Sequence, residues 1–124
     1  AELWDFKPDA PMWNFFALFV GDGTFAFQDL EGRAYRVDLH TGRMLWKAGG
    51  DPGTWTDGTA MLGDGVVYAV SVDGGPLSPG KLWAFRLSDG RELWRAPVPQ
   101  PPNSWPLPLP GTGTVLIAIG QQGG

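Results

Sequence analysis

The stretch ThrGlyArgMetLeuTrp (Thr41 to Trp46) recurs, with changes, 48 residues later as AspGlyArgGluLeuTrp (Asp89 to Trp94). The chain also begins with AlaGluLeuTrp, residues 1–4, which matches the end of the same phrase. Recurrence at a regular interval is the first sign of a repeat architecture. The phrase therefore predicts a chain built from copies of one structural unit.

The residues that follow the three aligned tryptophans also recur at similar spacings. A further tryptophan comes nine residues after Trp4 and Trp46, and eleven residues after Trp94. A Gly-x-Gly turn comes next in each copy, at residues 21–23, 63–65 and 111–113. Glycine and aspartate tolerate the positive φ angles of tight hairpin turns, so each of these turns predicts a pair of flanking strands.

Each repeat contains short runs typical of β-strands, separated by turn residues. No segment keeps apolar residues at helical spacing over ten residues, so no helix is expected. Four short strands in units of 42 and 48 residues indicate the blades of a β-propeller, an all-β fold. The clearest expected strands are Thr24–Gln28, Ala34–Asp38, Val66–Val72, Leu82–Leu87 and Thr114–Ile119, with a fourth strand of each unit ending at Trp46 or Trp94.

The repeats divide the chain into one segment of a propeller. Residues 1–4 form the end of a blade, 5–46 and 47–94 form two full blades, and 95–124 form a partial blade. Since a closed propeller needs at least four blades, such a chain leaves sheet faces and strand edges open. Because the chain also starts at Ala1 without methionine, we expect a processed protein or a piece of a longer one. We expect it to sit against other protein subunits or against the remainder of a longer chain.

Composition excludes several classes of function. The net charge is −4 with no basic cluster, which argues against nucleic-acid binding. There is no cysteine, so disulfides and thiolate metal sites are excluded. No apolar run reaches 18 residues, so no membrane-spanning helix is expected.

Candidate catalytic and metal-binding residues are few. His40 is the one histidine and precedes ThrGly, where an ordinary turn residue is the simpler interpretation. Asp22, Asp57 and Asp64 each precede a glycine, a pattern more typical of turns than of calcium ligands. The residues therefore predict no catalytic group, no metal site and no cofactor.

The phrase resembles the tryptophan-docking repeat of quinoprotein-type propellers, whose pattern is Ala-x-Asp-x-x-Thr-Gly-x-x-x-Trp. That family contains the pyrroloquinoline quinone (PQQ) dehydrogenases and a related non-catalytic scaffold for outer-membrane assembly. The copy at 36–46 matches at four positions, and the copy at 84–94 matches at three and has aspartate in place of threonine. The docking residues that the resemblance implies are Asp38, Thr41, Gly42, Trp46, Ala84, Asp89, Gly90 and Trp94.

The resemblance implies that each docking tryptophan packs between two blades. It also implies an extracytoplasmic protein, and a PQQ site in the resembling enzymes would need calcium ligands and a vicinal disulfide. This chain has no cysteine, and its carboxylates do not match those ligands. We therefore favour a non-catalytic scaffold or protein-interaction module, with a fragment or subunit of a PQQ-dependent dehydrogenase as the alternative.

Two departures from the repeat carry expectations of their own. Arg36 occupies the alanine position, and because an unpaired buried guanidinium is costly, it should meet a carboxylate or solvent. Phe15 and Phe16 align with Asp57 and Gly58 of the next copy, which indicates either apolar surface for a partner or a different core packing. The residues expected at an interface are Trp4, Phe15, Phe16, Val115 and Ile117.

The stretch from Pro97 to Pro110 contains seven prolines. Proline fixes φ and removes backbone donors, so the stretch should be extended. It connects two blades in the propeller interpretation, and a second interpretation makes it a ligand for an aromatic groove on another protein.

Overall fold

The computed structural model describes residues 3–12, 15–56, 60–102 and 104–120. These residues form antiparallel strands and turns, with no helix among them, so none of them forms a helix that could span a membrane. The all-β fold expected from the repeats is confirmed. Glu2, Trp13, Asn14, Asp57 and Gly58 lie outside the described residues.

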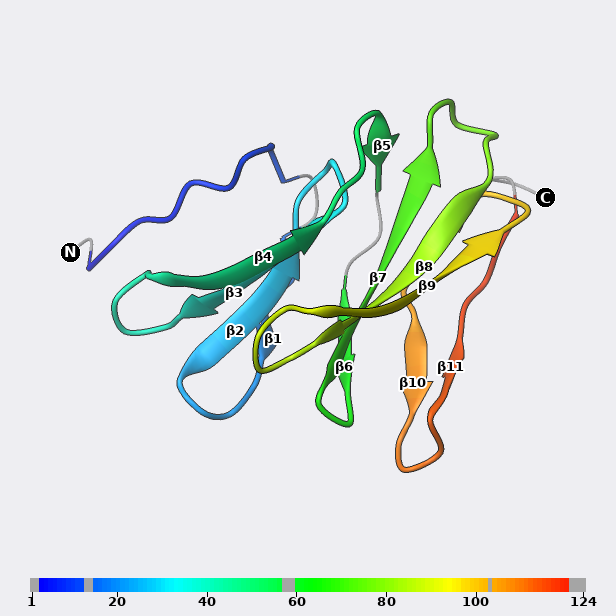
Figure 1. Ribbon diagram of the computed structural model, residues 1–124. Helices are drawn as coiled ribbons and strands as arrows, with labels where there is room; N and C mark the ends of the chain where they lie inside the picture. The colour runs from blue at the N-terminus through cyan, green and yellow to red at the C-terminus, as the bar shows by residue number, and fades with distance from the viewer. Residues whose placement is uncertain (1–2, 13–14, 57–59, 103, 121–124) are drawn as a thin grey trace.

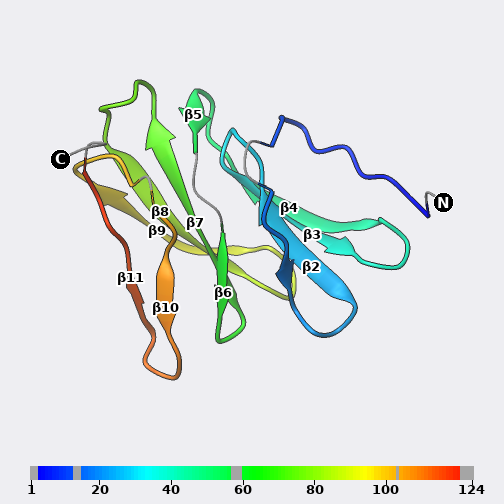
Figure 2. The same cartoon turned by 180° about the vertical axis from the view of Figure 1, so that it is seen from behind.

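Three sheets lie side by side (Figures 1 and 2). The first has the order β1 (Leu18–Phe19), β2 (Thr24–Gln28), β3 (Arg33–Asp38) and β4 (Met44–Gly49). The second has the order β5 (Thr54–Trp55), β7 (Val66–Asp73), β8 (Gly80–Arg86) and β9 (Glu92–Val98), and β6 (Met61–Gly63) pairs with the start of β7. The third is a hairpin of β10 (Leu107–Leu109) and β11 (Thr114–Leu116).

The strands form where the turn chemistry predicted them. In the turn between β6 and β7, Asp64 and Gly65 both have positive φ, at 51° and 75°. Two such residues connect strands with the twist of a tight hairpin. The sheets stay open, and their arrangement is that of adjacent blades of a partial propeller.

Three expectations about strand positions need correction. Trp46 and Trp94 lie inside β4 and β9, because both strands continue past the tryptophan along the edge of their sheets. Leu3 and Trp4 form no strand. In the second sheet, the single strand expected before the Gly-x-Gly turn is split into β5 and β6, which both pair with β7. The division of the chain at residues 46 and 94 stays a prediction.

The core lies between the first two sheets, where small side chains face large ones. Ala26 and Ala34 of the first sheet are fully buried in one apolar cluster with Trp83 and Phe85 of the second. The alternation of a β-strand places their neighbours on the opposite faces. The other face of the first sheet is therefore mainly aromatic, with Phe25, Phe27 and Tyr35 beside Val37, and Trp4, Phe6 and Ala17 pack against it.

The proline-rich stretch packs against the second sheet and its neighbours. Pro102 and Pro106 are fully buried. A Cβ built on Gly80 would lie 2.6 Å from the Pro102 ring, and one built on Gly63 would lie 2.5 Å from Pro108. These contacts favour the connector interpretation over an exposed ligand for an aromatic groove.

The two repeated tryptophans differ in burial. Trp46 is 7% exposed, and Trp94 is 39% exposed, so the burial expected for Trp94 is not found. The second sheet covers the Trp46 ring. Among the described residues, no sheet covers the Trp94 ring in the same way.

Replacing Trp46 with alanine should therefore lower the free energy of unfolding by about 3 to 5 kcal/mol, the range for truncating a large core aromatic. Trp94→Ala should cost about 1 kcal/mol, as expected for a residue outside the core. Denaturant titration of both variants checks this difference. Equal losses would show that the burial difference is wrong.

Candidate functional site

The contact that joins the first two sheets centres on Trp46. Its indole Nε1 donates a hydrogen bond to the backbone oxygen of Leu87, at 2.8 Å. Its ring lies on Gly90, where an added Cβ would come within 2.6 Å of the ring and where φ is +76°. Glycine is required at this position on both counts, because a side chain would collide and an L-residue would be strained.

Trp4 makes the same contact one repeat earlier. Its Nε1 donates to the backbone oxygen of Leu39 at 2.8 Å, and a Cβ on Gly42 would lie 2.5 Å from its ring. In both contacts the acceptor precedes the glycine by three residues. The residues after Trp4 form the N-terminal segment, which runs beside the first sheet (Figure 1).

The turn that carries Gly42 is held by side-chain caps. Asp38 Oδ1 accepts hydrogen bonds from the backbone N–H groups of His40 and Thr41, both at 2.9 Å. These bonds, that of Thr41 first, lower the pKa of the Asp38 carboxyl. Thr41 Oγ1 accepts from the N–H of Arg43 at 3.2 Å.

The second copy of the turn keeps this geometry with different residues. Asp89 stands at the threonine position and accepts from the N–H of Arg91 at 3.0 Å, which lowers the pKa of the Asp89 carboxyl. Arg86 stands at the aspartate position and pairs with Asp89 at 3.2 Å. Asp89, paired with Arg86, therefore caps this turn as Asp38 caps the first one, and Gly90 keeps its position under the Trp46 ring.

Arg36 reinforces the joint between the sheets. Its guanidinium contacts Asp22 Oδ2 at 2.6 Å and Thr24 Oγ1 at 3.0 Å, and it donates to the Leu87 oxygen at 2.9 Å. That oxygen also accepts the Trp46 indole. The expectation that Arg36 would be partnered is confirmed. In the second sheet the same position holds the smaller, fully buried Ala84.

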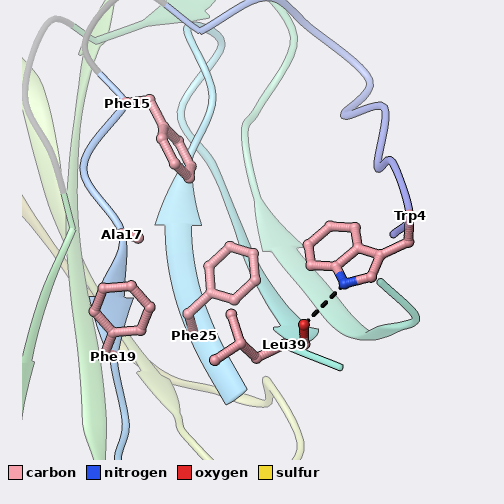
Figure 3. A pocket seen from close by; sticks show the side chains of 6 residues that line it. All are labelled: Trp4, Phe15, Ala17, Phe19, Phe25 and Leu39. Atoms are coloured by element: carbon pink, nitrogen blue, oxygen red, sulfur yellow. Dashed lines mark hydrogen bonds between the residues drawn. The ribbon is translucent and has the colours of Figure 1, made fainter. Parts of the chain in front are cut away.

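A pocket opens on the aromatic face of the first sheet (Figure 3). Its volume is about 200 Å³ and every residue that lines it is apolar. Ala17 comes from the segment before β1, and Phe25 from β2. The complete lining is Trp4, Phe15, Ala17, Phe19, Phe25 and Leu39.

The equivalent positions of the second sheet are closed. There Trp46, Val67, Leu62 and Leu87 take the places of Trp4, Phe25, Phe19 and Leu39, as the strand register shows. All four belong to or pack against the cluster that contains Leu18 and Ala26 of the first sheet. The first sheet thus fills, on the second sheet, the space that corresponds to this pocket.

The structure places the expected interface residues in different surroundings. Phe15 is exposed at the pocket rim and meets Phe25 and Phe27 edge-on. Phe16, also exposed, contacts Trp105, with 5.5 Å between ring centroids.

Val115 and Ile117 point inward. Both pack against the face of the second sheet that carries Tyr68, Val70, Leu82 and Ala84. Their contact is therefore with the chain itself, and Leu116 between them is exposed.

Sequence reasoning missed four residues of the pocket, namely Ala17, Phe19, Phe25 and Leu39. Phe19 had a detectable signal, because it lies opposite Phe25 in the β1–β2 pairing and shares its face. Leu39 had a second signal, since it stands three residues before Gly42, as Leu87 stands before Gly90.

The acidic turn residues take part in packing. Asp22 binds Thr24 and Arg36, and Asp64 accepts a hydrogen bond from the N–H of Gly111 at 2.8 Å, which ties two hairpin turns together. Asp57 lies outside the described residues. The residues present do not fit a PQQ–calcium group, because the chain has no cysteine and its described part has no group of three His, Cys, Asp or Glu side chains that could hold a metal ion.

Comparison with known proteins gives one family. A profile of the family described as outer membrane protein assembly factor BamB, a PQQ-type repeat, matches residues 1–119. A search of curated proteins gives no match.

Solved structures share the fold. A europium-containing methanol dehydrogenase is 24% identical with a TM-score of 0.56, and the match covers 64% of this chain and 14% of that one. The quinohemoprotein alcohol dehydrogenase ADHIIG from Pseudomonas putida HK5 is 22% identical with a TM-score of 0.53, over 60% of this chain and 12% of that one. The chain thus spans a small part of each neighbour's length.

Gly90→Ala should destabilise the protein more than Gly65→Ala. Both glycines have φ near +75°, but a Cβ on Gly65 meets nothing within 4 Å, whereas one on Gly90 meets the Trp46 ring. Gly65→Ala should cost about 1 to 2 kcal/mol for the left-handed backbone. Gly90→Ala should cost about 2 kcal/mol more for displacing the ring. Denaturant unfolding measures both, and equal costs would contradict the contact.

The link between Asp22 and Arg36 should depend on pH. The Thr24 hydroxyl first, and the Arg36 charge after it, lower the pKa of the Asp22 carboxyl below its usual 3.8. A lowered folded pKa gives stability above pH 3.8 that is lost as the pH falls through the folded value. Wild type should therefore unfold at higher denaturant concentration than Asp22→Asn at about pH 7, and the gap should close as the pH falls through the lowered pKa of Asp22 in the folded protein. A constant gap would refute the link.

Proposed function

The chain belongs to the family described as outer membrane protein assembly factor BamB, and from this premise we propose that it is a non-catalytic β-propeller scaffold within a larger assembly. In this role it presents open sheet faces to protein partners. The proposal includes the tryptophan-docking role of Trp4 and Trp46, which rests on their contacts with Gly42 and Gly90.

The apolar pocket on the first sheet is the observation that carries this proposal. Exposed apolar surfaces of this kind mark sites that bind a protein, a membrane or a ligand, and the proposal takes the first of these. Phe19 is 67% exposed and Phe15 is 56% exposed at this rim. Covering this rim with a partner would remove apolar surface from water, which stabilises a complex by about 25 cal/mol for each Å² buried.

The internal repeat defines the occupant of the pocket. One repeat later, Leu18 and Ala26 of a neighbouring sheet close the equivalent volume over Val67. We therefore assign the pocket to a β-sheet, of another subunit or of the remainder of a longer chain, that presents a leucine-sized and an alanine-sized side chain from adjacent strands. A small polar ligand does not match a lining without polar side chains.

A fragment or subunit of a PQQ-dependent dehydrogenase is the second candidate, and the likeness to two alcohol dehydrogenases motivates it. At their level of identity that likeness concerns the fold. The residues of this chain do not fit the PQQ–calcium group, so no step of quinone chemistry follows from them. An extracytoplasmic location is part of the scaffold proposal and follows the family resemblance.

Filling the pocket tests whether it is the apolar surface that the scaffold proposal requires. Ala17→Trp places a large ring in the cavity, so binding of a hydrophobic dye should fall at least about tenfold while unfolding remains cooperative. The control Leu77→Ser removes an apolar residue of the β7–β8 loop that is about as exposed as Phe19 at the pocket rim, and it should leave dye binding unchanged. Dye binding is followed by fluorescence, and the association state by sedimentation.

Two results would contradict the scaffold proposal. One is a monodisperse protein that binds no hydrophobic dye. The other is saturable binding of PQQ with calcium, seen by absorbance, accompanied by dye-linked oxidation of an alcohol.

A further inference from the structure

An aspartate recurs at the same place after Trp4 and after Trp46. Asp9 follows Trp4 by five residues, and Asp51 follows Trp46 by five. Neither aspartate belongs to a strand. Asp9 lies in the N-terminal segment beside the first sheet, and Asp51 lies in the connection from β4 to β5 (Figure 1). Residues 5–11 are called the first linker and residues 50–53 the second linker, so each linker carries one carboxylate at an equivalent position.

The carboxylate of the first linker meets two cations of the first sheet. Asp9 Oδ2 lies 2.5 Å from Lys47 Nζ on β4 and 4.0 Å from Arg33 Nε on β3. The Lys47 hydrogen bond first, and the Arg33 charge after it, hold the pKa of the Asp9 carboxyl below its usual value. The hydroxyl of Tyr35 on β3 also accepts a hydrogen bond from the Asp9 N–H, at 2.9 Å. Both the side chain and the backbone of Asp9 are therefore attached to this sheet.

The carboxylate of the second linker meets two cations of the second sheet. Asp51 Oδ2 lies 3.1 Å from Arg95 Nη1 on β9 and 3.8 Å from Lys81 Nζ on β8. Each of these cations comes 48 residues after its counterpart in the first sheet. Arginine and lysine exchange places between the two copies, so each copy has one of each. What recurs is therefore the charge at each position and not the residue type.

The cations on the third strand of each sheet are held by an acid of the same sheet. Arg33 Nη1 lies 3.3 Å from a carboxylate oxygen of the buried Asp29, which directly follows β2. Lys81 Nζ lies 2.7 Å from a carboxylate oxygen of Asp73, which ends β7. Both cations are therefore positioned by their own hairpin, and the linker carboxylate meets a group that is already ordered.

The cation on the fourth strand of the second sheet is held by its own sheet as well. The Arg95 guanidinium lies 2.8 Å from a Glu92 oxygen and 4.2 Å from the centre of the Trp83 ring. An isolated exposed ion pair contributes little, because ordering two long side chains has an entropic cost. Where the cation is ordered beforehand, less of that cost falls on the new contact.

The contacts of Asp51 lie at the opposite end of β8 from the Trp46 contact. Trp46 contacts the turn between β8 and β9, whereas Lys81 stands near the start of β8, beside the β7–β8 loop. The chain just after the second linker is also bonded to the first sheet, because the Thr56 N–H donates to the Leu30 oxygen at 2.8 Å. A sheet attached at one point can pivot about it, and an attachment at the far end removes that freedom.

We infer that Asp9 and Asp51, each with its two cations, form a repeated carboxylate clamp that fastens each linker to the following sheet separately from the tryptophan contact. The two aspartate side chains are 46% and 40% exposed, so dissolved salt screens the clamp. The Trp46 contact is buried and uncharged, so salt leaves it unchanged. Linker packing therefore responds to ionic strength. All of the groups involved belong to this chain, so the clamp does not depend on the proposed scaffold role.

Hydrogen exchange, followed by NMR on the whole chain, measures each clamp at its own amide. The Leu30 N–H donates to the Pro11 oxygen of the first linker, and the Thr54 N–H donates to the Asp51 oxygen of the second. Raising NaCl from about 0.01 M to about 1 M shortens the screening length from about 30 Å to about 3 Å. Protection of both amides should fall about two- to fivefold, the range for exposed ion pairs, while protection of the Trp46 indole stays constant.

Two variants should separate the two clamps. Asp9→Asn should lower protection of the Leu30 amide alone and Asp51→Asn that of the Thr54 amide alone, each about two- to fivefold. Each variant should also remove the salt response of its own amide, so each is a control for the other. Asp5→Asn removes the same charge from an exposed residue of the first linker that forms no ion pair with the described residues, and it should change neither amide.

A double substitution tests the pair directly. Lys47→Gln should lower protection of the Leu30 amide as Asp9→Asn does, and the double variant should lose little more than Asp9→Asn alone, because both changes remove one interaction. Additive losses would contradict that pairing.

Three further results would overturn the inference. One is unchanged protection of Thr54 in Asp51→Asn. Another is a loss shared equally by both linker amides in either single variant, because that pattern reports opening of the whole protein and not of one linker. The third is a salt response of the Trp46 indole as large as that of the linker amides.

Discussion

The contact between a tryptophan ring and a glycine of the next sheet is the constraint on which the rest of the structure depends. A sheet buries one face against a neighbour only if the two are held in one orientation. Trp46 fixes that orientation, because its ring needs the bare backbone of Gly90 and its indole needs the oxygen of Leu87. The small residues Ala26 and Ala34 then pack in one buried cluster with Trp83 and Phe85.

The same constraint explains where the molecule is open. A repeat buries its faces only when another repeat lies on each side, so the first sheet retains an apolar pocket and the β10–β11 hairpin retains a free edge. The described chain thus carries two surfaces whose completion is visible elsewhere in the same molecule. For the first sheet, that internal template is the basis of the proposal that a sheet with small apolar side chains covers the pocket.

Local patterns in the sequence were sufficient to predict the hairpins and the spacing between glycine and tryptophan, because turn residues and a repeated motif can be recognised within a short stretch of sequence. Strand ends, the exposure of Trp94 and the inward direction of Val115 depend on which sheet covers which face. The pocket depends on the N-terminal segment, whose residues have no strand pairing to indicate their course. Arg36 was expected to find a partner, but its bond to the Leu87 oxygen joins residues 51 positions apart and has no local signal.

Hydrogen exchange of the individual indole N–H groups, assigned by NMR, tests the central claim most directly. The account predicts that the Trp46 indole exchanges only when the two sheets separate, while the Trp94 indole exchanges at close to the rate of free tryptophan. Equal exchange rates for Trp46 and Trp94 would show that the contact with Gly90 and Leu87 does not hold the sheets together, and would contradict the account.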